Sequence, residues 1–124
     1  MNVIVADDSV VVRTLVKKVL TGIGHQAIQA VHGGEVLECL EKADPQIDLI
    51  LMDWNMPTMD GFEALKEIKG DQRFSSIPVI MLTSESDEKR INMAYDVGAN
   101  GYLEKPFTPD ELIAHIDKVM GTGN

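Results

Sequence analysis

Cysteine, long apolar runs and basic residues are all scarce in this chain, and each scarcity excludes a class of protein. The one cysteine, Cys39, rules out an internal disulfide framework and fits a reducing compartment. No apolar run approaches the length of a membrane span, and the segment after Met1 lacks the basic start of a secretory signal, so we expect a cytoplasmic protein. Lysine and arginine number 11 against 20 acidic residues, and the net charge of −9 disfavours nucleic acid and membrane surfaces as partners.

The chain of 124 residues has the length of a single domain. Short apolar runs alternate with segments of helical period, and this alternation is typical of a parallel sheet whose strands are joined by crossover helices. We therefore expect an α/β fold, a doubly wound (βα)5 domain with helices on both faces of the sheet. The expected strands are residues 3–6, 26–31, 49–52, 79–82 and 101–103.

The expected helices differ in how clearly the sequence defines them. The last is the best defined, with Thr108 as N-cap, Pro109 at the first helical position and Glu111 closing a capping box. The first has an apolar stripe at helical spacing, made of Val12, Leu15, Val16, Val19 and Leu20. The fourth, residues 87–97, depends on tertiary packing, because its stripe is thin and consists of Ile91, Ala94 and Tyr95.

Reactive side chains follow four of the expected strands. They are Asp7 and Asp8 after the first strand, Asp53 after the third, Thr83 after the fourth and Lys105 after the fifth. Ligands of an open parallel sheet bind beyond the carboxyl ends of its strands, so these side chains should meet at one edge. Carboxylates brought together repel one another unless a cation lies among them, and hard oxygen ligands favour Mg²⁺, Mn²⁺ or Ca²⁺ over zinc. Mg²⁺ is the ion we expect.

The donors at this edge point to an anion beside the cation. Lys105 and Thr83 offer hydrogen-bond donors that a lone metal site has no use for. The combination indicates that a divalent cation and a phosphoryl group are held together. No conventional nucleophile is evident, but a carboxylate can act as one and form an aspartyl phosphate. The residues alone do not decide among Asp7, Asp8 and Asp53 for that role.

Each of these residues also has an explanation that needs no active site. Asp7 and Asp8 at the start of a helix are typical of capping, Asp53 is consistent with an ordinary turn, and Thr83 and Lys105 suit a cap and a turn in the same way. The coincidence of all of them at one edge of one sheet favours a functional site.

Two enzyme or carrier functions on similar architectures are disfavoured. A phosphatase of the haloacid dehalogenase type needs two aspartates separated by one residue, whereas Asp7 and Asp8 are adjacent. A flavodoxin-like electron carrier needs a hydroxyl-rich and amide-rich phosphate loop, and two carboxylates there would repel the flavin phosphate. The histidines have neither metal-ligand spacing nor a triad, so we expect them at the surface; they are His25, His32 and His115.

Four segments carry a resemblance to a known family: Asp7-Asp8, Asp53 to Gly61 (DWNMPTMDG), Thr83-Ser84-Glu85, and Gly101 to Phe107 (GYLEKPF). They resemble the receiver domain of two-component response regulators, over essentially the whole chain. The run from Asp53 most resembles single-domain chemotaxis regulators. The resemblance implies a flavodoxin-like sheet with strand order 2-1-3-4-5, and a single receiver domain over residues 1–124 with no output domain.

The resemblance also implies roles for individual residues. Asp53 would accept a phosphoryl group from a phosphohistidine, and Thr83 and Lys105 would each bind a phosphoryl oxygen. The Mg²⁺ ligands would be Asp8, Asp53, Asp7 largely through water, and the backbone carbonyl of Asn55, with Mn²⁺ as a substitute ion. Tyr102 matches the aromatic residue that turns inward when the threonine moves, and the Lys105-Pro106 bond matches the family's cis peptide.

As a member of this family, the chain would be a phosphoacceptor signalling protein and not an enzyme, apart from self-phosphorylation by small donors and autodephosphorylation. Phosphorylation would change the face formed by the fourth helix, fifth strand and fifth helix. The implied partners of this monomer are a CheA-like sensor histidine kinase, the flagellar motor switch protein or another downstream protein, and a phosphatase. The alternative is a phosphorelay shuttle that passes phosphate to a histidine phosphotransfer protein.

Overall fold

The computed structural model describes residues 1–42, 44–84 and 87–121, so Glu85 of the predicted motif lies outside the described residues. Strands and helices alternate in the expected order. The strands are β1 (Asn2–Ala6), β2 (Gln26–Ala30), β3 (Leu49–Asp53), β4 (Val79–Thr83) and β5 (Gly101–Glu104). The helices are α1 (Val10–Gly22), α2 (Gly33–Glu41), α3 (Gly61–Gly70), α4 (Glu88–Val97) and α5 (Pro109–Met120).

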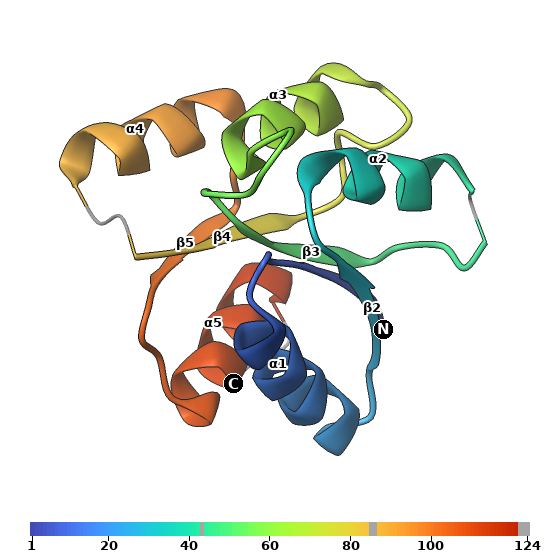
Figure 1. Ribbon diagram of the computed structural model, residues 1–124, viewed down its shortest axis with the longest axis vertical. Helices are drawn as coiled ribbons and strands as arrows, with labels where there is room; N and C mark the ends of the chain where they lie inside the picture. The colour runs from blue at the N-terminus through green and yellow to red at the C-terminus, as the bar shows by residue number, and fades with distance from the viewer. Residues whose placement is uncertain (43, 85–86, 122–124) are drawn as a thin grey trace.

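The strands form one parallel sheet in the order β2-β1-β3-β4-β5, which confirms the predicted fold class. Helices α1 and α5 cover one face of this sheet, and α2, α3 and α4 cover the other (Figure 1). All five residues of β3 and all five of β4 are buried, because both faces of these central strands are covered. None of the helices in the described parts of the chain is long and apolar enough to span a membrane.

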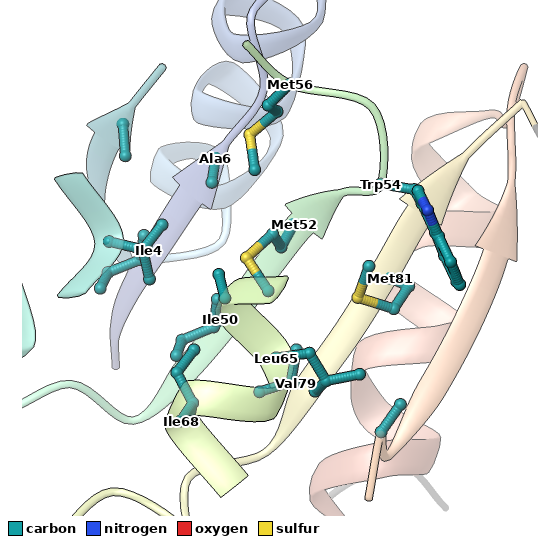
Figure 2. Close-up of a cluster of buried hydrophobic side chains, with 14 of the residues drawn as sticks. Ile4, Ala6, Ile50, Met52, Trp54, Met56, Leu65, Ile68, Val79 and Met81 are labelled. Atoms are coloured by element: carbon teal, nitrogen blue, oxygen red, sulfur yellow. The ribbon is translucent and has the colours of Figure 1, made fainter. Parts of the chain in front are cut away.

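Alternate residues of the central strands enter two separate cores. In β3, Ile50 and Met52 belong to the core beneath α2, α3 and α4, where they cluster with Leu65 and Ile68 of α3 (Figure 2). Leu49 and Leu51 belong to the core beneath α1 and α5. β1 and β4 divide in the same way, because successive side chains of a strand point to opposite faces. The sheet is thus held rigidly from both sides, and its carboxyl edge is fixed in position.

Polar caps define the helix ends that the sequence predicted. Ser9 caps α1 by accepting a hydrogen bond from the amide of Val12 at 3.3 Å. Thr108 and Glu111 form the predicted capping box of α5, with hydrogen bonds of 3.1 and 3.0 Å. Gly98 ends α4 with a φ of 120°, a backbone conformation that favours glycine.

The predicted apolar stripes were wrong at two positions. Tyr95 is 46% exposed and Leu15 is 42% exposed, whereas we expected both to face the core. Helix α4 lies at the end of its layer (Figure 1), so only a narrow face of it, with Ala94 at its centre, meets the core. Leu15 is similarly left at the rim of α1, beside Phe107.

The histidines are not all surface residues, which corrects our prediction. His115 is half-buried in α5 against Gly101, where an added Cβ would lie 2.7 Å from its Nε2 atom. Burial lowers the pKa of His115. His32 caps α2, and its Nδ1 accepts a hydrogen bond of 3.2 Å from the amide of Glu35. His25 contacts the terminal ammonium of Met1 at 3.0 Å.

Candidate functional site

The candidate site lies at the carboxyl edge of the sheet, where the strand order reverses between β1 and β3. β1 runs directly into Asp7, and β3 ends at Asp53. Because β1 and β3 are hydrogen-bonded neighbours, the two aspartates leave the sheet side by side. Thr83 is the last residue of β4, and Lys105 follows β5. The structure therefore brings the predicted residues to one edge, as the position of ligand sites in open parallel sheets suggested.

Three carboxylates form the centre of this site. Asp7, Asp8 and Asp53 each offer one oxygen, and these oxygens lie within 4.8 Å of one another. Asp7 is fully buried, Asp53 is 6% exposed, and Asp8 faces solvent. The carboxylates of Asp7 and Asp53 are thus buried, and that of Asp8 lies on the solvent side of the cluster.

Lys105 reaches into the same site and contacts both buried carboxylates. Its Nζ is 2.5 Å from Oδ2 of Asp7 and 3.5 Å from Oδ2 of Asp53. The other carboxylate oxygen of Asp7 accepts a hydrogen bond of 2.8 Å from the amide of Ser9. Both oxygens of Asp7 are therefore engaged by the protein itself. The peptide bond between Lys105 and Pro106 is cis, as the resemblance implied.

Asp53 has an unusual acidity. Burial raises the pKa of its carboxyl group from 3.8 to about 6, against the lowering effect of the Lys105 ammonium, and the negative charge of Asp7 adds to the increase. The amide of Asn55 also hydrogen-bonds this carboxylate and opposes the shift. Removing a carboxylate from water disfavours its ionised form, so a cation that binds here would stabilise it.

The donor set fits a divalent cation of the hard type. Three carboxylates and one ammonium leave the cluster with a charge of −2 when all are ionised. All three anionic ligands supply oxygen, and the described residues place no histidine or cysteine in the group. Oxygen ligands on a partly open site suit Mg²⁺, which keeps several waters.

Thr83 and Tyr102 lie on neighbouring strands beside this cluster. Thr83 is fully buried, and its carbonyl oxygen accepts a hydrogen bond of 2.8 Å from the amide of Lys105. Tyr102 pairs with Met81 across the β4–β5 ladder and is half-buried against the core beneath α2, α3 and α4. A backbone hydrogen bond thus links Thr83 to Lys105, and Tyr102 on the neighbouring strand β5 precedes Lys105.

The loop from β3 to α3 is fixed tightly against the end of β3. The amide of Gly61 donates a hydrogen bond of 2.8 Å to the carbonyl of Trp54, and a Cβ at Gly61 would collide with the carbonyl oxygen of Asp53. Asn55 is exposed at the start of this loop. Thr58 has a φ of 67°, which is rare for a β-branched residue.

Two residues that the sequence analysis did not single out contact the site. Arg13 donates a hydrogen bond of 2.6 Å to the carbonyl of Asp7. Trp54 follows Asp53, is buried, and contacts both the ring of Phe62 and the guanidinium of Arg90. The sequence held a signal for Arg13, because a basic residue near the start of a helix opposes the helix dipole and needs another reason to be there.

Comparison with known proteins agrees with this geometry. A family model described as the response regulator receiver domain matches residues 3–117. The chemotaxis protein CheY1 of Helicobacter pylori is 37% identical over 125 residues, which cover 100% of both chains.

Two solved structures are similar over nearly their whole length. The chemotaxis protein CheY4 of Vibrio cholerae has a TM-score of 0.89 at 35% identity, covering 95% of this chain and 97% of that one. The receiver domain of the sensor histidine kinase PA1611 of Pseudomonas aeruginosa, solved with a magnesium ion coordinated in its active site cleft, has a TM-score of 0.86 at 27% identity, covering 97% of each chain. The chain therefore belongs to the response regulator receiver domains, and it is similar over its whole length to chemotaxis proteins of the CheY type.

Proposed function

We propose that this protein is a phosphorylation-activated chemotaxis switch in which Asp53 accepts a phosphoryl group from a phosphohistidine of a sensor histidine kinase. Receiver domains of the CheY type are signalling proteins. One observation carries the assignment of Asp53: its carboxylate lies within 4.8 Å of Asp7 and Asp8 and 3.5 Å from the ammonium of Lys105. The proposed acceptor oxygen, the neighbouring carboxylates and the Lys105 ammonium thus lie close together.

Receiver domains bind Mg²⁺ at an acidic pocket, and the group of Asp7, Asp8 and Asp53 is that pocket here. We propose Asp8 and Asp53 as direct ligands, together with the backbone carbonyl of Asn55. Asp7 acts through water, because Ser9 and Lys105 already engage its two oxygens. The bound ion would neutralise charge on the phosphoryl oxygens, and Mn²⁺ should substitute because it prefers the same ligands.

In the proposed transfer, a carboxylate oxygen of Asp53 forms a bond to phosphorus as the bond from phosphorus to the donor imidazole nitrogen breaks. The imidazole keeps the electron pair and takes up a proton. Lys105 binds a phosphoryl oxygen and offsets its charge, and Thr83 donates a hydrogen bond to another. Positioning and charge neutralisation are the main requirements of phosphoryl transfer. Hydrolysis of the aspartyl phosphate by water returns the carboxylate and releases phosphate.

The proposed output is a change of the face formed by α4, β5 and α5. Thr83 is buried at the end of β4, and we propose that its hydroxyl moves towards a phosphoryl group on Asp53. Tyr102 lies on the neighbouring strand and is half-buried, and we propose that it turns inward when Thr83 moves. On the same face α4 exposes Met93 and Tyr95, with 36% and 46% of their surfaces accessible, as a partner surface requires.

We propose a CheA-like kinase as the donor and the flagellar motor switch protein as the target, with a phosphatase to end the signal. The similarity to CheY proteins over the whole chain supports this choice over a phosphorelay shuttle. We place the exchange in the cytoplasm, where the free thiol of Cys39 stays reduced.

The test is the mass of the intact protein after incubation with acetyl phosphate or a phosphorylated sensor kinase, with and without Mg²⁺. The parent should gain one phosphoryl group only when Mg²⁺ is present. Asp53→Asn should gain none, whereas Asp96→Asn, which changes an exposed aspartate of α4, should behave as the parent. A gain that persists in Asp53→Asn, or no gain from either donor, would overturn the proposal.

The partner is tested with the phosphorylated protein. Binding to a motor switch peptide that exceeds the binding of the unphosphorylated protein supports the chemotaxis assignment. Rapid loss of the phosphoryl group to a histidine phosphotransfer protein, without peptide binding, would replace it with the shuttle function.

A further inference from the structure

Arg13 contacts the backbone of the loop that carries Asp7 and Asp8. It lies near the start of α1, and its Nη1 donates a hydrogen bond of 2.6 Å to the carbonyl oxygen of Asp7. Its Nε donates a second hydrogen bond of 3.2 Å to the side chain of Gln29 on β2. Because two nitrogens of the planar guanidinium are held, its position is defined by two separate parts of the fold.

The contact with Arg13 completes the fixation of Asp7. The amide of Asp7 donates to the carbonyl of Ala30 at 3.0 Å, and its carboxylate oxygens accept from Ser9 at 2.8 Å and from Lys105 at 2.5 Å. The carbonyl oxygen is the one remaining polar atom, and Arg13 holds it. Every polar atom of this residue therefore has a partner.

The carbonyl of Asp7 belongs to the peptide unit that leads to Asp8. A peptide unit is planar, so the direction of its carbonyl fixes the orientation of the whole unit and the place where the next Cα lies. Asp8 is exposed, and within the described residues its side chain makes no hydrogen bond. The position of its carboxylate therefore depends on the backbone that precedes it.

We propose that Arg13 is a positioning residue for the metal site. By holding the Asp7 carbonyl, it orients the peptide between Asp7 and Asp8 and directs the Asp8 carboxylate towards the cation. This inference rests on the proposed Mg²⁺ site. Mg²⁺ demands near-ideal octahedral geometry, so a small rotation of one ligand weakens its binding more than it weakens binding of the larger and more tolerant Ca²⁺.

The positive charge of Arg13 has the opposite effect on a cation. If Arg13 acted only as a charge, its removal would strengthen Mg²⁺ binding, because one repulsive neighbour would be lost. If it acts by positioning, its removal weakens Mg²⁺ binding in spite of that gain. The sign of the change therefore distinguishes the two roles.

The experiment is a calorimetric titration of the intact protein with Mg²⁺ and, separately, with Ca²⁺. Arg13→Met keeps the aliphatic stem and should weaken Mg²⁺ binding at least about tenfold, the usual loss when a group that orients a ligand is removed. The loss of Ca²⁺ affinity should be clearly smaller. Arg13→Lys keeps a donor for the Asp7 carbonyl and should recover most of the Mg²⁺ affinity.

The matched control is Lys17→Met, which removes the same charge from an exposed position further along α1. It should leave Mg²⁺ affinity unchanged or slightly increased. Urea unfolding of every variant without metal verifies that each one is folded at the titration temperature.

The outcomes separate this inference from the proposed function. Unchanged or tighter Mg²⁺ binding in Arg13→Met, beside normal binding in the parent, would overturn the positioning role alone. A parent that binds no Mg²⁺ would overturn the metal site and this inference together. An equal loss for Mg²⁺ and Ca²⁺ that Arg13→Lys fails to recover would also overturn the positioning role.

Discussion

The guanidinium of Arg90 lies over the indole ring of Trp54, with its central carbon 5.5 Å from the ring centroid. Trp54 also stacks on Phe62, with centroids 4.9 Å apart and the ring planes 10° from parallel. Trp54 directly follows Asp53, and Arg90 belongs to the first turn of α4. This contact therefore joins α4 to the residue next to the proposed phosphoacceptor.

Replacement of Arg90 by methionine removes the cation from above the indole and keeps most of the stem. We expect the fluorescence of Trp54, the single tryptophan, to shift, and its response to phosphorylation to shrink. The free energy of unfolding should fall by about 0.5–1 kcal/mol, as is usual for cation–π contacts at partly exposed sites. Emission spectra and urea unfolding measure both effects. The neighbouring variant Lys89→Met should show neither, and equal spectra for the two variants would contradict the prediction.

Asp53→Asn should be more stable than the parent at neutral pH. The pKa of Asp53 is raised to about 6 by burial, so ionisation of this group costs stability in the folded state at any pH above that value. The cost is lost as the pH falls from about 6 towards 3.8, where the group is protonated in the folded protein and also becomes protonated in the unfolded chain. We expect a gain of about 1–2 kcal/mol at pH 7.5, after allowance for solvent screening, and almost none at pH 4.

Urea unfolding at these two pH values, without divalent cations, measures the difference. Asp96→Asn is the control, because it replaces an exposed aspartate and should track the parent at both pH values. A stability gain in Asp53→Asn that is the same at pH 4 and pH 7.5 would show that the charge of Asp53 is not its source.

Lys69 joins three segments at the end of the sheet opposite the site. Its ammonium donates to three uncharged oxygens, which are the carbonyls of Ser75 and Ile77 at 3.1 and 2.8 Å and Oδ1 of Asn100 at 3.0 Å. Burial lowers the pKa of Lys69. Lys69→Met should reduce the free energy of unfolding by about 1–2 kcal/mol, because these partly buried oxygens lose a charged donor. Lys89→Met, which changes an exposed lysine of α4, should cost less than about 0.5 kcal/mol.

Thr58 is strained, and its replacement should stabilise the protein. Its φ of 67° places a β-branched side chain in the left-handed region, which asparagine tolerates much better. Thr58→Asn should raise the free energy of unfolding by about 0.5–1 kcal/mol. Thr58→Ala keeps a Cβ and should gain little. Denaturant unfolding of both variants tests this. If the free energy of unfolding rises equally in the two, the gain comes from losing the threonine side chain and not from relief of backbone strain.

The meeting of Asp7, Asp53 and Thr83 could be predicted from the sequence, because a parallel sheet aligns the carboxyl ends of its strands regardless of packing details. The caps of α5 could be predicted for a similar reason, since Thr108 and Glu111 act within one helical turn. In both cases the relevant geometry is local or follows from the sheet order.

Other features depended on neighbours that the sequence does not identify. Arg13 contacts a backbone carbonyl whose direction no residue pattern encodes. His115 is half-buried because Gly101 on β5 leaves space for its ring, and Tyr95 is exposed because α4 lies at the end of its layer (Figure 1). Each of these positions is set by how one element packs against another, which the local residue pattern does not specify.

The close approach of Gly61 to Asp53 makes one side of the proposed acceptor more tightly packed than the other. On one flank, α3 begins in backbone contact with the end of β3 and leaves no space even for a methyl group. We therefore expect a displacement that starts at Asp53 to be resisted at α3 and to pass more readily towards β4 and α4. If Asp53 is the phosphoacceptor, a partner that contacts α4 should distinguish the two states of this protein better than one that contacts α3.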